Sequence, residues 1–191
     1  HKWGQSLPIG VQLFSIRNYV NKELENTAEK LAEMGYQYVE PAGYNKQNHT
    51  IHGKSPKIFA EVLAANGLKA ISAHAAFSLA EADMALDDFA TLGVKYLVCP
   101  SARGEFRKTL DGYKIVAEEL NAIGQKAKER GIAFGYHNHD FEFTKIDGQV
   151  PYDLLLSHTD TNAVFFQVDI GWMIKSGNNP VDYFKKNPGR F

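Results

Sequence analysis

The residues best suited to chemistry lie in one stretch, from Ile132 to Phe143. Its first half is apolar and follows a glycine, which is typical of a buried strand. Its second half carries His137, His139 and Glu142, whose side chains can bind a divalent metal or transfer protons. The two histidines share one face of an extended chain, because side chains alternate along a strand. One can bind a metal while the other contacts substrate or moves a proton; a structural role is the alternative for either.

Ionisable residues also end apolar runs elsewhere in the chain. Asp169 follows residues 164–168, and Glu40 and His74 end two earlier runs. A carboxylate that ends a buried strand needs a partner, because burying an unpaired charge is costly. We expect a metal or cation at Asp169, with a helix cap as the alternative. Glu40 is expected to bind substrate hydroxyls, to act as a base, or only to pair with Arg17. The strand ends of a parallel barrel meet on one face, so these residues should converge.

Three further residues complete the candidate site. Trp172, beside Asp169, offers an apolar wall for a sugar ring. Lys175 can bind an anionic group or stabilise a developing enolate charge, with a solvated lysine as the alternative. Glu142 lies on the turn beyond its strand, where it can serve as an oxygen ligand or form a surface salt bridge.

Four segments repeat the same order of an amphipathic stretch, a glycine and an apolar run. The four glycines are Gly35, Gly67, Gly93 and Gly131. Glycine just past a helix end adopts the left-handed conformation that closes the helix. Repetition of helix, glycine and strand predicts βα units and a parallel sheet.

The pattern predicts six βα units in a single domain, residues 1–191. The expected strands span residues 9–16, 36–40, 68–74, 94–99, 132–137 and 164–169. The expected helices span residues 22–34, 79–92, 109–130 and 152–157, with two more opening at Ser55-Pro56 and Asn179-Pro180. A closed eight-stranded barrel typically takes about 250 residues. We therefore expect either an open six-stranded sheet or a barrel without its last two units.

Composition argues against several classes of protein. The net charge is −1 with both signs interspersed, which disfavours binding to a phosphate backbone. Cys99 is the single cysteine, so no internal disulfide can form, and a buried inert thiol is expected. No apolar run has membrane-spanning length, and no GxSxG, P-loop, HExxH or GxGxxG motif is present. The chain begins at His1, so we expect its natural start to be missing, and cytoplasmic and exported locations both stay open.

Several of these motifs resemble the sugar phosphate isomerase/epimerase family of xylose isomerase-like TIM barrels. They are Gly10-Val-Gln-Leu-Phe-Ser, Tyr38-Val-Glu, Ser72-Ala-His, Tyr136-His-Asn-His-Asp-Phe-Glu-Phe and Val168-Asp-Ile-Gly-Trp. The resemblance implies an α/β fold, a (β/α)8 TIM barrel. This chain would supply about six βα units of it, with strands 7 and 8 missing, as in a truncated domain.

The resemblance also implies one divalent metal ion (Mn, Co, Zn or Mg), bound at the C-terminal face by residues from strands 5 to 8. Asp169 matches the strand 6 ligand. The strand 5 ligand is either His137, by register, or Glu142, the nearest carboxylate. We assign Glu142 and Asp169 to the metal and leave His137 open. The strand 7 and strand 8 ligands have no counterpart in this chain.

The implied chemistry is proton abstraction beside a sugar carbonyl, as in a metal-dependent sugar isomerase/epimerase. The residues assigned to catalysis are His137, His139, Glu40 and Lys175. The residues assigned to binding the sugar or sugar derivative are His74, Trp172, Gln12 and Phe14. A keto-sugar lyase or dehydratase of the same barrel family, or an inactive sugar- or partner-binding subunit, are the alternatives. The related fold of metal-dependent apurinic endonucleases is disfavoured by the neutral charge balance, so we expect no nucleic-acid partner; a homo-oligomer stays open.

Overall fold

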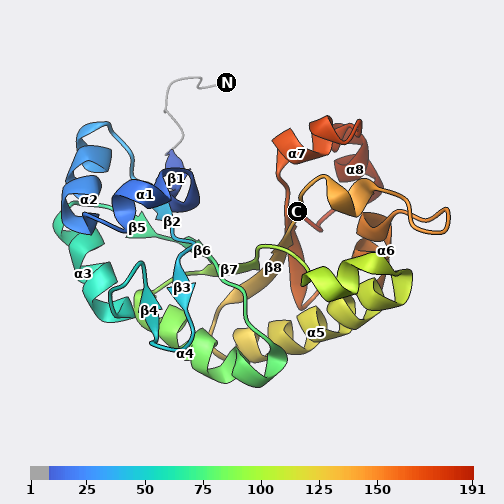
Figure 1. Ribbon diagram of the computed structural model, residues 1–191, viewed down its shortest axis with the longest axis horizontal. Coiled ribbons are helices and arrows are strands. Elements are labelled where there is room, and N and C mark those ends of the chain that lie inside the picture. The colour runs from blue at the N-terminus through green and yellow to red at the C-terminus, as the bar shows by residue number, and fades with distance from the viewer. Residues whose placement is uncertain (1–8) are drawn as a thin grey trace.

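The computed structural model, which describes residues 9–191, is built on parallel strands that follow one another around an arc (Figure 1). These strands are β1 (Gly10–Gln12), β2 (Tyr38–Glu40), β5 (Lys69–Ala70), β6 (Ser72–His74), β7 (Tyr96–Cys99), β8 (Ala133–His137) and β9 (Val164–Gln167). Only Ile71 separates β5, which pairs with β2, from β6, which pairs with β7. These two segments therefore occupy one strand position, and the six predicted βα units are confirmed.

The arc is open between its first and last strands. The hydrogen-bonded order runs β1-β2-β5 and then β6-β7-β8-β9, with every pair parallel. The amide of His74 donates to the Pro41 carbonyl oxygen at 2.8 Å and links the two groups of strands. Within residues 9–191, no ladder joins β1 to β9. Figure 1 shows the strands on the inside of the arc and the helices around its outside.

The helices on the outside of the arc follow the predicted pattern. They are α2 (Leu24–Glu33), α3 (Pro56–Ala65), α4 (Ala82–Leu92), α5 (Leu110–Glu129) and α6 (Pro151–His158). All four glycines of the repeated pattern have positive φ angles, between 70° and 89°. The prediction that they close helices is therefore confirmed. Ser55 caps α3 by accepting from the amide of Ile58 at 3.4 Å, as its position before Pro56 predicts.

The first predicted strand is shorter than expected. Residues 9–16 were predicted as one strand, but β1 ends at Gln12 and is followed by the 3₁₀ helix η1 (Leu13–Ile16) and the short helix α1 (Arg17–Val20). The Gln12 side-chain oxygen accepts from the amide of Phe14 at 3.0 Å and so starts the turn. A local side-chain bond of this kind offers the backbone an alternative to a strand ladder.

A small hairpin between β2 and α3 was not predicted. Its strands are β3 (Tyr44–Asn45) and β4 (Thr50–Ile51), paired antiparallel. Asn45 Oδ1 accepts from the amides of Gln47 at 2.9 Å and Asn48 at 3.2 Å, which turns the chain. Each strand is only two residues long, too short for a periodic pattern to predict it.

Three 3₁₀ helices and two helices complete the described chain. They are η2 (Leu79–Glu81), η3 (Gly104–Lys108), η4 (Phe141–Phe143), α7 (Ile170–Lys175) and α8 (Pro180–Lys186). The longest helix, α5, has twenty residues and several charged side chains. Within residues 9–191, no helix is both long and apolar enough to cross a membrane.

The last two strands carry an apolar layer on each face. On one face, Phe166 contacts Tyr136 and Tyr152, with ring centroids 6.2 and 5.5 Å apart. On the other face, the Phe165 ring covers Gly135, where an added Cβ would lie 2.7 Å from the ring. Because side chains alternate, His137 and Gln167 share this second face with Gly135 and Phe165. The phenyl ring therefore forms an apolar base beneath the polar strand ends.

The packing of α5 against the segment before β9 gives a test of the fold. We expect Gly124→Ala to lower the free energy of unfolding by about 1–3 kcal/mol, because the new methyl group would overlap the backbone carbonyl of Ala163. That cost should exceed the helix-propensity gain of about 1 kcal/mol. Urea unfolding measures the change. Gly104→Ala is the control, since an added Cβ there meets open space. Equal stability of the two variants would contradict the close approach.

Candidate active site

A cavity of about 520 Å³ lies at the C-terminal ends of the strands. The predicted site residues that line it are Gln12, Phe14, His74, His137, His139, Asp169 and Trp172. They come from strands that are far apart in sequence and meet here because parallel strands end on one face of the arc. Tyr44 and Ser101, which the sequence did not single out, also line the cavity. Three predicted residues, Glu40, Glu142 and Lys175, lie outside this lining.

His137 and Asp169 form the chemical centre of the cavity. His137 Nε2 lies 3.8 Å from Asp169 Oδ2. The other carboxylate oxygen, Oδ1, accepts from the amide of Trp172 at 2.9 Å and caps α7. The cap that was weighed against a functional role is therefore present, and it leaves Oδ2 directed toward His137.

Asn138 holds Asp169 in place from the neighbouring strand end. Its side chain is fully buried, and its Oδ1 accepts from the amide of Asp169 at 3.0 Å. Its Nδ2 donates to the carbonyl oxygen of Asp169 at 3.2 Å. This role was not predicted. The signal in the sequence was an amide side chain between the two histidines of the most specific motif.

The two histidines of the motif are neutral at physiological pH. Burial, together with the neighbouring His74 and His139 rings, lowers the pKa of His137 to about 4. Burial also lowers the pKa of His139, with a smaller contribution from Arg107. The His139 ring stacks on the Phe141 ring, with centroids 5.3 Å apart, and its centroid lies 5.5 Å from that of the Trp172 ring. Both rings can therefore offer a lone pair to a metal or accept a proton.

Glu40 lies beneath the cavity in a hydrogen-bonded group, which we call the Glu40 cluster: Gln12, Glu40, His74 and Gln167. Gln12 Nε2 donates to Glu40 Oε1 at 2.7 Å, and Gln167 Nε2 donates to Glu40 Oε2 at 2.8 Å. His74 Nε2 lies 3.2 Å from Glu40 Oε1 and 2.6 Å from Gln167 Oε1. Glu40 therefore holds side chains of the site together. Gln167 was not predicted as a site residue, although side-chain alternation places it on the same face of the strand as Asp169.

The predicted pair between Glu40 and Arg17 does not form. The guanidinium of Arg17 donates to the Phe14 carbonyl oxygen at 2.7 Å and lies 4.2 Å above the Phe14 ring. Arg17 follows the turn after β1 and is carried away from the strand ends, which explains why it cannot reach Glu40. The contact instead supports Phe14 at the cavity wall.

Glu142 was assigned to the metal, but the structure turns it into the core. Its side chain is fully buried. Tyr136 Oη donates to Oε1 at 2.7 Å, and the amide of His139 donates to Oε2 at 2.8 Å. Glu142 lies in η4, at the end of the motif, and these two contacts hold its oxygens outside the cavity lining. Of the two alternatives for the strand 5 position, His137 is thus the one that faces Asp169.

Lys175 lies at the outer rim of the site. Its Nζ forms an ion pair with Asp140 at 2.8 Å and lies 4.3 Å above the Trp172 ring. Its side chain is 60% exposed, so it holds the Trp172 wall from outside and does not line the cavity.

The described residues offer some of the ligands that a divalent metal ion needs. An imidazole nitrogen and a carboxylate oxygen, as in His137 and Asp169, are ligands that Mn, Co, Zn and Mg sites use in various combinations. In residues 9–191, however, no group of three or more His, Cys, Asp or Glu side chains is arranged to hold a metal ion. The described residues thus offer a pair of ligands, and further ligands must come from water, substrate or other residues.

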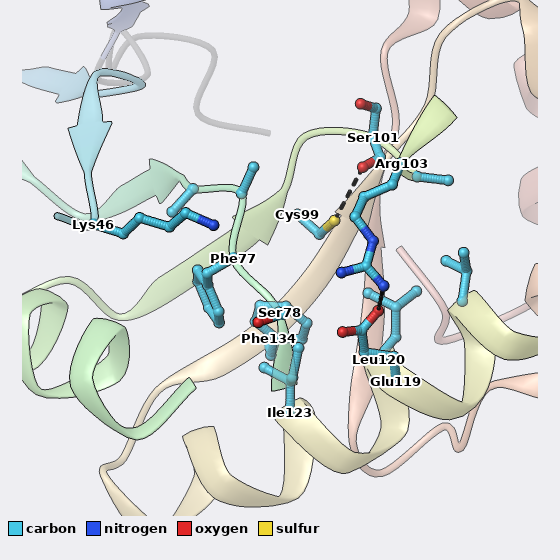
Figure 2. A pocket seen from close by; sticks show the side chains of 14 residues that line it. Lys46, Phe77, Ser78, Cys99, Ser101, Arg103, Glu119, Leu120, Ile123 and Phe134 are labelled. Atoms are coloured by element: carbon cyan, nitrogen blue, oxygen red, sulfur yellow. Dashed lines mark hydrogen bonds and ion pairs between the residues drawn. The ribbon is translucent and has the colours of Figure 1, made fainter. Parts of the chain in front are cut away.

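A smaller cavity of about 150 Å³ adjoins the site and shares Ala75, Ala76 and Ser101 with it (Figure 2). Its walls are largely apolar, with Phe77 and Phe134 among them, and its Arg103 is paired with Glu119 at 3.1 Å. Cys99 also lines this cavity, where burial raises the pKa of its thiol to about 12. The thiol is therefore unreactive, in agreement with the sequence analysis.

Comparison with known proteins decides the family. A family model described as the xylose isomerase-like TIM barrel matches residues 28–190. The chain belongs to this family. Two solved structures from Parabacteroides distasonis ATCC 8503, both described as a sugar phosphate isomerase/epimerase, are similar to it. One has a TM-score of 0.88 at 26% identity, covering 100% of this chain and 75% of the other. The second has a TM-score of 0.89 at 30% identity, covering 97% and 77%.

Among curated proteins, an inosose dehydratase from Clostridium botulinum (strain Alaska E43 / Type E3) is 33% identical over 87 residues. The match covers 46% of this chain and only 28% of that relative. The xylose isomerase-like family thus includes relatives with both isomerase and dehydratase names, and all place this chain in a family of enzymes.

The burial of Glu142 can be tested by the pH dependence of the free energy of unfolding. Burial raises its pKa from 4.5 to about 6, so the folded state binds its proton more tightly than the unfolded state. Stability from this group is therefore lost as the pH rises through this interval, by about 2 kcal/mol. Relative to wild type, Glu142→Gln should gain about that amount between about pH 4 and about pH 7 in urea unfolding.

His137 titrates with the opposite sign in the same interval, but it is present in both proteins and cancels. Glu118→Gln, at an exposed position of α5, is the matched control for replacing a carboxylate by an amide. A difference between Glu142→Gln and wild type that does not change with pH would contradict the buried carboxylate.

Proposed function

We propose that this chain belongs to a sugar isomerase or epimerase that moves a proton at the carbon next to a carbonyl group. The observation that carries the proposal is the pair of lone-pair donors, His137 Nε2 and Asp169 Oδ2, facing each other across 3.8 Å in the central cavity. Trp172 and Phe14 supply apolar walls, which suit the faces of a sugar ring. The neutral imidazoles beside them are suited to proton transfer.

His137 and Asp169 are the residues that would hold a divalent ion (Mn, Co, Zn or Mg). Such an ion, when bound, polarises the carbonyl and hydroxyl oxygens of the substrate. The protein contributes the orientation of its two ligands. Asn138 fixes the backbone of Asp169, and the amide of Trp172 holds the carboxylate oxygen that does not face His137. Outer contacts of this kind are known to tune metal affinity.

His139 is the residue we assign to proton transfer. It lines the cavity beside His137, with the ring centroids 5.0 Å apart. Stacking on Phe141 and contact with Trp172 fix the plane of the ring. Its lowered pKa leaves the ring neutral at physiological pH, so it can take the proton from the substrate carbon and return it to the same or the neighbouring carbon.

A dehydratase is the second candidate function. The inosose dehydratase similar to this chain supports it, although the match covers less than a third of that relative's length. Dehydration begins with the same proton abstraction. It differs in the second step, where a hydroxyl on the neighbouring carbon leaves as water. The geometry of His137, His139 and Asp169 serves the shared first step of both reactions.

Exchange of a substrate proton with solvent deuterium tests the assigned role of His139. We expect His139→Gln to slow exchange at the carbon next to the carbonyl by about 10²–10⁴-fold, the usual contribution of a general base. The assay is NMR in D₂O with Mn²⁺ or Co²⁺, on a panel of ketoses, sugar phosphates and an inosose. His158→Gln, at an exposed position of α6, should exchange like wild type. Undiminished exchange by His139→Gln would remove His139 from the mechanism.

The same reactions, followed by mass spectrometry, separate the two candidates. An isomerase or epimerase replaces a carbon-bound hydrogen by deuterium and keeps all heavy atoms of the substrate, whereas a dehydratase releases one water molecule. If the wild-type protein exchanges no proton on any substrate of the panel, with either metal, the catalytic proposal fails and an inactive sugar- or partner-binding subunit is favoured.

A further inference from the structure

We propose that Gln167 is a positioning residue that sets the tautomer of His137, so that Nε2 of this ring presents a bare lone pair to the cavity. The hydrogen-bond assignment stands on the geometry of the Glu40 cluster. Its consequence for catalysis rests on the proposed function, in which Nε2 of His137 is a metal ligand.

Glu40 fixes the orientation of the Gln167 side chain. A carboxylate only accepts hydrogen bonds, so the group that lies 2.8 Å from Glu40 Oε2 must be a donor, the NH₂ of Gln167. The reversed amide would place two oxygens in contact at that distance. Glu40 itself is held from the opposite side, because Gln12 donates to its other oxygen at 2.7 Å.

Gln12 is oriented independently. Its own oxygen accepts from the amide of Phe14 at 3.0 Å, so its NH₂ must face Glu40. Donors from both ends of the arc therefore converge on Glu40, from Gln12 on β1 and from Gln167 on β9.

With its NH₂ on Glu40, Gln167 directs its oxygen at two histidines. Oε1 lies 2.6 Å from His74 Nε2 and 3.2 Å from His137 Nδ1. An amide oxygen only accepts, so both of these ring nitrogens must carry a hydrogen. Glu40 Oε1 also lies 3.2 Å from His74 Nε2 and can only accept, so it likewise requires a hydrogen on that nitrogen.

The contact with Gln167 determines the tautomer of His137. A neutral imidazole has one N–H, and Gln167 places it on Nδ1. Nε2 is then bare and lies 3.8 Å from Asp169 Oδ2. Two acceptors that face each other without a hydrogen between them are suited to share a cation or a substrate hydroxyl. Gln167 thus prepares His137 for that role without lining the cavity itself, in the way that partners of ligand histidines fix the ring nitrogen that binds.

Nitrogen NMR of ¹⁵N-histidine-labelled protein tests the proposal directly, because protonated and bare ring nitrogens have distinct chemical shifts. His137→Gln assigns the signals by their loss. In the metal-free wild-type protein we expect a hydrogen on His137 Nδ1 and a bare Nε2. Gln167→Met keeps the length of the side chain and removes the acceptor, so the His137 signals should move toward exchange between tautomers. Gln125→Met makes the same substitution at an exposed position of α5, away from the Glu40 cluster, so its His137 signals should match wild type.

A hydrogen on Nε2 in the wild type overturns the proposal, even if Gln167→Met does not fold. Unchanged His137 signals in Gln167→Met overturn it as well. Titration with Co²⁺ alone tests the consequence: Gln167→Met should bind about 10–100-fold more weakly than wild type, while Gln125→Met binds within a few-fold of it. If the wild type binds no Co²⁺, the proposed metal function fails, and the tautomer assignment is still decided by the NMR spectra.

Discussion

The half-buried carboxylate of Glu40 is the constraint on which the site depends. A charge withdrawn from water is costly unless it is fully hydrogen-bonded. Glu40 meets this requirement with donors from three other strand positions: Gln12 on β1, His74 on β6 and Gln167 on β9. These bonds cross the inside of the arc, where no strand ladder joins its two ends within residues 9–191. Satisfying one carboxylate therefore fixes where the ends of distant strands lie.

The site is built in layers around the Glu40 cluster. Phe165 against Gly135 forms an apolar base, the Glu40 cluster lies on it, and His137 with Asp169 faces the cavity. Glu142, a fully buried carboxylate within the motif, accepts from both the amide of His139 and the hydroxyl of Tyr136. His137, Asp169 and His139 are thus each held by a partner that does not line the cavity: Gln167, Asn138 and Glu142. Such support is what keeps a catalytic group in a productive geometry.

Much of this could be predicted from the sequence, because it follows from local periodicity. The glycines before the strands predicted the βα units, and polar residues at strand ends predicted a site that includes His74, His137 and Asp169. Other features depend on contacts between segments far apart. Glu142 has the chemistry of a metal ligand, and only the fold of η4 shows that Tyr136 occupies it. Gln167 reaches Glu40 across 127 positions of sequence, a distance that no local pattern covers. The turn after Gln12 was not predicted, because the hydrogen bond from the Phe14 amide to the Gln12 side chain ends the strand in spite of the strand propensity of the residues that follow.

The central claim is that His137 and Asp169 act together on one divalent ion at the end of the strands. A crystal structure of the protein soaked with Mn²⁺, with anomalous diffraction recorded for the metal, tests it most directly. We expect an anomalous peak within coordination distance of both His137 Nε2 and Asp169 Oδ2. A bound Mn²⁺ that contacts neither residue, or that is held by Glu142 with its contact to Tyr136 broken, would contradict it.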